Sequence, residues 1–183
     1  VGSRAYASAA AESGWVPSPL PAIYTGEGTR AYRDWLPANG FEGMSTIGGS
    51  FVSDRVEDYY FTPWDLDYGR VVKFDHEFIG RKALEAMAPG PHRQKVTLVW
   101  NPDDVAELFR GLQDAEGLAP KIMEMPAAHY AAHPYDRVEK DGALVGVSIT
   151  PIYSANERAF LSLAIVAPEQ AVTGTELSVV WGE

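Results

Sequence analysis

Two stretches in the second half of the chain, LVGVSI at residues 144–149 and AFLSLAIV at residues 159–166, are typical of β-strands with at least one buried face. The turn-forming pairs Asp141-Gly142 and Thr173-Gly174 lie on either side of this region. The elements expected here are the strands Lys95–Trp100, Leu144–Ile149, Ala159–Val166 and Glu176–Trp181, and a short helix at Asp103–Leu112. We therefore predict that residues 92–183 form a β-barrel domain that is cut short at its end.

Residues 1–88 follow a helical period instead. SRAYASAAAE at residues 3–12 is rich in Ala, carries a Ser able to cap its first turn and is followed by Gly14, which predicts a helix. The other elements expected here are a loop at Val16–Ala22, helices at Tyr24–Leu36 and Glu77–Met87, and a strand at Gly69–Phe74. The Pro89-Gly90-Pro91 cluster marks the expected boundary. The predicted fold class is α+β, with a partial α+β domain over residues 1–88.

The composition favours a folded protein that does not bind polyanions. Of the 183 residues, 46% are hydrophobic, and 25 Asp and Glu against 15 Lys and Arg give a net charge of -10. No window gathers the cations that a phosphate backbone requires, and no stretch approaches the ~18 apolar residues of a membrane span. The chain has no Cys, which excludes thiolate chemistry. We expect no nucleic-acid partner, no membrane segment and a cytoplasmic protein.

Three stretches, taken in order, resemble the aminomethyltransferase family, which comprises the glycine-cleavage T-protein and its folate-dependent relatives. GSRAYASAAAESG, at residues 2–14, resembles a helix that ends in the family's Glu-Ala-Gly signature. TPWDLDYGRVVKFDHEFIGRKAL, at residues 62–84, resembles the family's run of Thr-Pro, Gly and Phe-Ile-Gly-Arg-x-Ala-Leu. VGVSIT, FLSLAIV and GTEL, within residues 142–177, resemble its carboxy-terminal barrel.

A narrower resemblance points to the vanillate and syringate O-demethylases of lignin-degrading bacteria. It is carried by SGWVPSPLPAIYTGE at residues 13–27 and GGSFVSDRVEDYYFTPWDLDYG at residues 48–69. The resemblance implies a tetrahydrofolate cofactor, a small methoxybenzoate substrate and an N-terminal remainder of the same chain. The absence of a starting Met also leads us to expect a piece of a longer chain. One-carbon transfer from an amine and a non-catalytic scaffold remain as alternatives.

The resemblance assigns roles to three residues near the first helix. Glu12, in Glu12-Ser13-Gly14, aligns with the signature Glu, whose carboxylate presents two acceptors to the amino and ring N–H groups of a pterin. Tyr6 could hydrogen-bond the ether oxygen and stabilise the departing phenolate. Trp15 could stack on a pterin or benzoate ring. The alternatives are an exposed helix-terminal Glu, a core Tyr and a core Trp.

Two cations are further candidates for ligand contact. Arg81, in the first turn of the helix expected at residues 77–87, and Lys73 are suited to a folate glutamyl tail or a substrate carboxylate. The alternative for Arg81 is a structural ion pair. The Gly48-Gly49 pair leaves two explanations open as well, close approach to a ligand and close packing.

Other catalytic classes receive little or no support from the sequence. His129 and His133 have the i, i+4 spacing of two metal ligands on a helix, but no general-base Glu lies between them and Pro134 follows at once. The predicted metal content is therefore none. The chain contains no phosphate-binding loop, no dinucleotide-binding glycine motif and no serine-hydrolase elbow.

Overall fold

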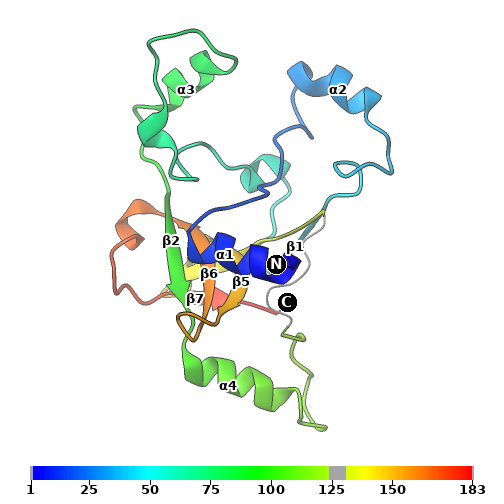
Figure 1. The fold of residues 1–183 in the computed structure, drawn as a ribbon, viewed down its shortest axis with the longest axis vertical. Helices are drawn as coiled ribbons and strands as arrows, with labels where there is room; N and C mark the ends of the chain where they lie inside the picture. The colour runs from blue at the N-terminus through cyan, green and yellow to red at the C-terminus, as the bar shows by residue number, and fades with distance from the viewer. Residues whose placement is uncertain (1, 124–130, 183) are drawn as a thin grey trace.

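The computed structural model describes residues 2–123 and 131–182. Within these residues the α-helices are α1 (Ser3–Glu12), α2 (Arg30–Trp35), α3 (Arg81–Met87) and α4 (Pro102–Gly111). The strands are β1 (Thr46–Gly48), β2 (Gln94–Val99), β3 (Ala132–Pro134), β4 (Asp136–Lys140), β5 (Ala143–Ser154), β6 (Ala159–Val166) and β7 (Ser178–Val180) (Figure 1). Short 3-10 helices are η1 (Glu27–Thr29), η2 (Val56–Tyr59), η3 (Gly69–Val71) and η4 (Pro168–Gln170). Helices and an antiparallel sheet together confirm the α+β class.

The main sheet has five antiparallel strands in the order β2-β6-β5-β4-β7, and β1 and β3 form a small parallel pair beside it. β5 lies at its centre, between β6 and β4, and the strands predicted at Leu144–Ile149 and Ala159–Val166 are confirmed. The turn between β4 and β5 is the predicted Asp141-Gly142 pair, with φ of 51° and 79°, the left-handed conformations that a two-residue hairpin of this twist requires.

The predicted barrel is wrong, because the main sheet is open. Within the described residues β2 pairs only with β6 and β7 only with β4, whereas a barrel needs two partners for every strand. The sheet curls enough for Trp100, after β2, to meet Trp181, after β7, edge to face at 5.7 Å between ring centroids. β7 has only 3 residues and offers too little backbone to pair along β2.

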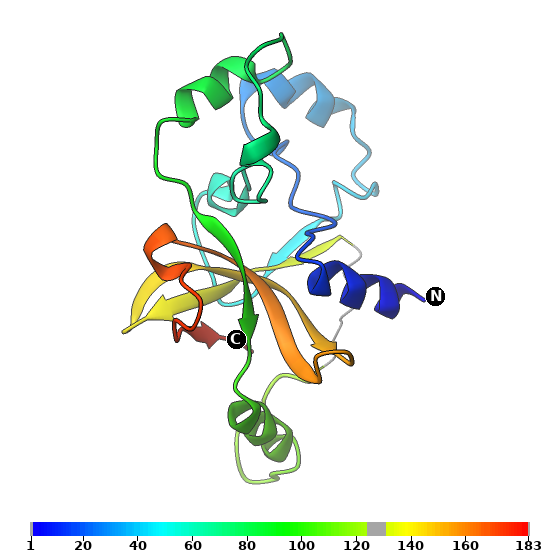
Figure 2. The ribbon, with the colours of Figure 1, turned by 60° about the vertical axis from the view of Figure 1, so that its left-hand side comes forward.

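The larger hydrophobic core lies on one face of the main sheet. Its buried members from the sheet side are Tyr135, Val147, Ile149, Ile152, Leu161, Leu163 and Ile165. Its members from the first part of the chain are Ala11, Val16, Leu20 and Tyr59. The small Ala side chains let α1 lie close against β5 and β6 (Figure 2). The division into domains at residues 1–88 and 92–183 stays a prediction, although this core draws on both parts.

Several predicted elements need correction. The helix at residues 3–12 is confirmed, but its N-cap is Gly2, so the predicted Ser cap is wrong. The helix expected at Glu77–Met87 begins only at Arg81, and the one expected at Tyr24–Leu36 is reduced to η1 and α2. The strand expected at Gly69–Phe74 is wrong as well. A Cβ on Gly69 would lie 2.4 Å from the Trp64 ring, so this segment turns against the indole as η3.

Two segments rise from the main sheet as separate arms. The first arm, residues 24–44, carries η1 and α2, and the second arm, residues 66–90, carries η3 and α3. Figure 1 shows α3 and α2 apart at one end of the molecule, with the sheet below them and α4 at the opposite end. Neither α2 nor α3 contains a buried residue.

Candidate functional site

The end of α1 places the candidate residues. Gly14 adopts the left-handed conformation, with φ of 72°. The Trp15 N–H donates to the Ala10 carbonyl at 2.9 Å and the Gly14 N–H to the Ala11 carbonyl at 3.0 Å. These two bonds are those of a Schellman motif, which reverses the chain at a helix end. Glu12 thus occupies the last helical position, and Trp15 is folded back toward the helix.

Glu12 is held by the connection between β5 and β6. The Ser154 hydroxyl donates to Oε1 at 2.5 Å and the Asn156 amide donates to Oε2 at 2.8 Å. These bonds, Ser154 first, lower the pKa of Glu12 below its ordinary value. A carboxylate has about four acceptor positions, so each oxygen keeps one. The exposed Glu12 side chain is therefore an ionised, anchored acceptor pair that can still receive two donors.

A bulge in β5 brings Ser154 to this place. Ile149 pairs with Leu163 but Ile152 with Leu161, so β5 carries one residue more than β6 between these pairs, and Thr150 takes a φ of 52°. Such a bulge bends its strand and re-aims the residues beyond it. Ser154 is fully buried, and its Oγ also accepts the Glu157 N–H at 3.0 Å. Sequence reasoning missed Ser154 and Asn156, because nothing local links them to a residue more than 140 positions earlier.

Tyr6 and Trp15 form a second part of the site. Their rings meet edge to face, with centroids 6.0 Å apart. Both are partly exposed, Tyr6 at 55% and Trp15 at 41%, so neither is the core residue of the alternative reading. Six residues of an α-helix turn through about 600°, which directs Tyr6 about 120° away from Glu12. Tyr6 therefore contacts Trp15 on one side of α1. Glu12 contacts the β5–β6 connection on a neighbouring side of the same helix.

Arg81 lies apart from this site. Its guanidinium bonds Glu77 at 2.6 Å, Glu85 at 2.8 Å and the His76 carbonyl at 3.0 Å. Figures 1 and 2 both place α3 away from α1, so Arg81 is not brought to Glu12 within this chain. Its ion pairs agree with the structural alternative. Ligand contact by Arg81 stays a prediction.

The described residues offer no metal centre, since no group of three or more His, Cys, Asp or Glu comes together among them. His129 lies outside the described residues. His133 lies in β3, not on a helix, and is buried. Desolvation lowers its pKa despite a bond with the Ser18 backbone, and its Nε2 has no hydrogen-bond partner. His133 is therefore best described as a neutral core residue.

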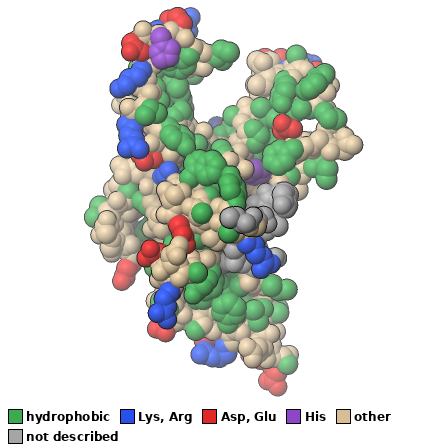
Figure 3. All heavy atoms as spheres, viewed as in Figure 1, with side chains coloured by type: hydrophobic (Ala, Val, Ile, Leu, Met, Phe, Trp, Pro, Cys, Tyr) green, Lys and Arg blue, Asp and Glu red, His purple; other side chains and the backbone are tan. Residues whose placement is uncertain are grey.

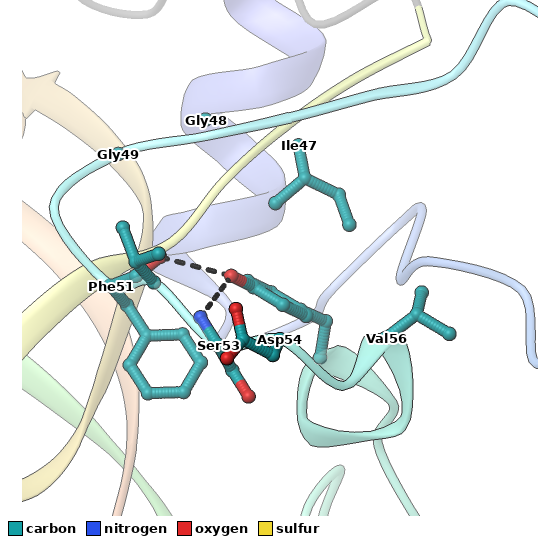
Figure 4. A pocket seen from close by; sticks show the side chains of 9 residues that line it. Ile47, Gly48, Gly49, Phe51, Ser53, Asp54 and Val56 are labelled. Atoms are coloured by element: carbon teal, nitrogen blue, oxygen red, sulfur yellow. Dashed lines mark hydrogen bonds between the residues drawn. The ribbon is translucent and has the colours of Figure 1, made fainter.

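A hollow of about 390 Å³ lies between β1 and η2, and its apolar wall includes Ile47, Phe51 and Val56. The Tyr59 hydroxyl accepts the Ser53 N–H at 2.8 Å and donates to the Phe51 carbonyl at 3.2 Å, the dashed lines of Figure 4. This volume is within the range of small-ligand sites, roughly 300–1,000 Å³. The sequence indicated no residue of this wall except the neighbouring Gly48-Gly49 pair.

The structure decides between packing and ligand contact for Gly49. Its φ is 94°, and a Cβ there would lie 2.1 Å from the Tyr135 carbonyl oxygen. Close backbone approach therefore explains Gly49. A Cβ on Gly48 would meet nothing within 4 Å, so packing does not explain Gly48.

A second hollow, of about 470 Å³, lies at the base of the second arm beside Trp64 and His92, whose rings stack at 4.3 Å. Two of its cations are already engaged. Arg93 pairs with the buried Asp65 at 2.9 Å, and the Lys95 ammonium donates to the Leu66 carbonyl at 3.0 Å. These two contacts hold the base of the second arm to β2.

Comparison with known proteins supplies the remaining observation. The chain is 48% identical over all of its 183 residues to syringate O-demethylase of Sphingobium sp. (strain NBRC 103272 / SYK-6). The predicted resemblance to the syringate O-demethylases is confirmed. The chain is also 34% identical, over 173 residues and 90% of its length, to sesamin methylene transferase of Sinomonas sp. (strain No.22). No family model matches it.

The chain spans only 39% of the first relative and 38% of the second. The names of both relatives denote removal or transfer of a one-carbon group, so the chain is related to enzymes of that kind over nearly its whole length. Among the described residues no helix is both long and apolar enough to cross a membrane.

Proposed function

We propose that this chain is part of a tetrahydrofolate-dependent O-demethylase, which moves a methyl group from a methoxybenzoate of the vanillate or syringate type to tetrahydrofolate. In this proposal it works in the cytoplasm within a longer chain, whose N-terminal part completes the pocket. The support is the 48% identity to a syringate O-demethylase and the geometry around Glu12.

The proposal depends on one observation, the ionised Glu12 carboxylate held in place by Ser154 and Asn156. A pterin presents an amino group and a ring N–H side by side, and a carboxylate with one free acceptor position on each oxygen matches that pair. Ser154 and Asn156 fix the carboxylate in place before any ligand arrives. A preoriented acceptor loses less side-chain entropy on binding. The acceptor pair of Glu12 therefore fits the two neighbouring donors of a pterin.

Tyr6 and Trp15 would serve the leaving group. Tetrahydrofolate, when bound, supplies the nitrogen that accepts the methyl group. The bond between the methyl carbon and the ether oxygen breaks as the carbon bonds to that nitrogen. The electron pair stays on the oxygen as a phenolate, and the proton lost from the nitrogen balances its charge. The Tyr6 hydroxyl donates a hydrogen bond to that oxygen, and this bond strengthens as the charge grows. Trp15 supports the Tyr6 ring from its edge and offers a flat apolar face to a ligand ring.

Folate affinity of the full-length protein tests the role of Glu12. Replacing Glu12 by Ala removes hydrogen bonds to a charged group, which contribute on the order of 1.5–3 kcal/mol. Folate affinity should therefore fall by about one to two decades, while affinity for the methoxybenzoate changes little. Titration calorimetry with each ligand measures both constants.

Two control variants separate ligand contact from structure. Glu169→Ala removes an exposed carboxylate in η4 and should change neither affinity. Asn156→Ala removes one anchor but keeps the carboxylate, so its effect on folate should be smaller than that of Glu12→Ala. Equal loss of both ligands, or no loss of folate, would show that Glu12 only holds the β5–β6 connection.

A further inference from the structure

The two arms expose apolar side chains that a folded chain normally buries. Ile79 in the second arm is fully exposed, and Trp35 in the first arm is 74% exposed. The other large hydrophobic residues exposed on the arms are Tyr32, Phe41, Met44, Tyr68, Val71 and Met87. Scattered exposed apolar residues are ordinary, but a gathering of them marks an interaction surface.

The arms reach the main core only at their bases, through the half-buried Tyr24 and Leu66. α2 has 6 residues and α3 has 7, lengths at which a helix is marginal in water without tertiary packing. Polar contacts hold each arm instead. Arg33 donates to the carbonyls of Ile23, Thr25 and Gly26, and Arg81 bridges Glu77 and Glu85. Figure 3 shows the hollow between the arms, with charged side chains on the outer edge of the second arm and hydrophobic ones toward the hollow.

About three fifths of the length of syringate O-demethylase has no counterpart in this chain. We infer that the apolar surface between the arms is the docking surface for the remaining part of the same protein, which inserts there and buries α2 and α3. The inference rests on the proposed function only in taking the whole protein to be longer than this chain. A second copy of the chain is the competing occupant.

Site-directed labelling in the full-length protein tests this surface. These 183 residues contain no Cys, so each introduced Cys is the only thiol in this part of the protein. The variants are Trp35→Cys and Ile79→Cys in the arms, with Val172→Cys as the matched control on an exposed side chain outside them. Labelling with a small maleimide is followed by peptide mass spectrometry, which reads each position separately. Neither folate nor substrate is present, so the result does not depend on the proposed activity.

We expect position 172 to react at the rate of a denatured sample, and positions 35 and 79 at least about tenfold more slowly, because a buried site reacts only on local opening. Hydrogen exchange of the unmodified protein should show matching protection of α2 and α3, which guards against a variant that fails to fold. Equal labelling rates at positions 35, 79 and 172 would overturn the inference. Protection that disappears on dilution to monomer would also overturn it, in favour of a second copy.

Discussion

Glu12 has two tasks. It fastens α1 to the β5–β6 connection, and in the proposed function it offers its remaining acceptor positions to a ligand. The first task depends on ionisation. Hydrogen bonds from Ser154 and Asn156 stabilise the charged form and lower the pKa of Glu12. The unfolded chain then binds more protons than the folded one as the pH falls below the ordinary value of 4.5.

Stability should therefore depend on Glu12 in one pH window. The contribution of Glu12 is complete above about pH 4.5 and is lost as the pH falls through its lowered pKa. Urea unfolding of the wild type and of Glu12→Gln, from pH 7 down to pH 3.5, measures the difference. The wild type should be the more stable at pH 7, and the gap should narrow in acid. A gap that is constant over this range would contradict the assigned hydrogen bonds.

Tyr6 allows a test of the leaving-group role. Tyr6→Phe keeps the ring that meets Trp15 and removes only an exposed hydroxyl, so folding and substrate binding should be nearly unchanged. Turnover should fall about 10²- to 10³-fold, the usual loss for one donor to a developing oxyanion. Steady-state kinetics of the full-length enzyme on vanillate or syringate measure this. Tyr153→Phe, which removes a phenol from an exposed residue outside the arms and keeps the ring that meets Phe160, should leave turnover unchanged. A Tyr6→Phe turnover within about threefold of wild type would make Tyr6 a packing residue.

At the scale of elements, β1 depends on a close approach that only glycine permits. Gly49 lies against the backbone of Tyr135, and this proximity allows the Tyr135 N–H to bond the Gly48 carbonyl at 2.7 Å and the Phe51 N–H to bond the Tyr135 carbonyl at 3.0 Å. Any side chain at Gly49 would separate these segments and would also be strained at a φ of 94°.

The neighbouring glycines therefore form a matched pair. Gly49→Ala should destabilise the protein by at least about 2 kcal/mol, because steric overlap adds to backbone strain. Gly48→Ala has open space for its Cβ and should cost less than about 1 kcal/mol. Denaturant midpoints of the two variants measure the difference. Similar midpoints would show that the β1 region relaxes, and the packing explanation of Gly49 would be wrong.

The elements that sequence reasoning predicted well are those with a local signal. Alanine content and Gly14 predict α1, and apolar runs between the turn pairs Asp141-Gly142 and Thr173-Gly174 predict β5 and β6. β4, with the sequence DRVEK, gives no such signal, because it has one apolar residue, the buried Val138, and its other residues are all charged. β3 contains a Pro and exists only through its pairing with β1. Whether these two segments form strands depends on pairing partners, some of which are distant in sequence.

The same limit applies to the site. The resemblance indicated Glu12, Tyr6 and Trp15, and the Schellman motif that orients Trp15 follows from Gly14. The anchors Ser154 and Asn156 could not be predicted, because they reach Glu12 only through the β5 bulge and the packing of α1 on the sheet. Arg81 is predicted as a ligand contact from its charge, with an ion pair as the alternative, and in this chain its charge is shared with Glu77 and Glu85.

At the scale of the whole molecule, the central claim is that a methyl group passes from an aryl ether to a folate on the protein to which this chain belongs. The most direct measurement follows the methyl carbon itself. Syringate with ¹³C in both of its methoxy groups is incubated with the full-length protein and tetrahydrofolate, and the products are analysed by NMR and mass spectrometry. The account predicts that every demethylated phenol is matched by one labelled methyl group on folate, and that no phenol forms without folate. Phenol release without folate, or an intact methoxy group after long incubation of folded protein with both ligands, would contradict it.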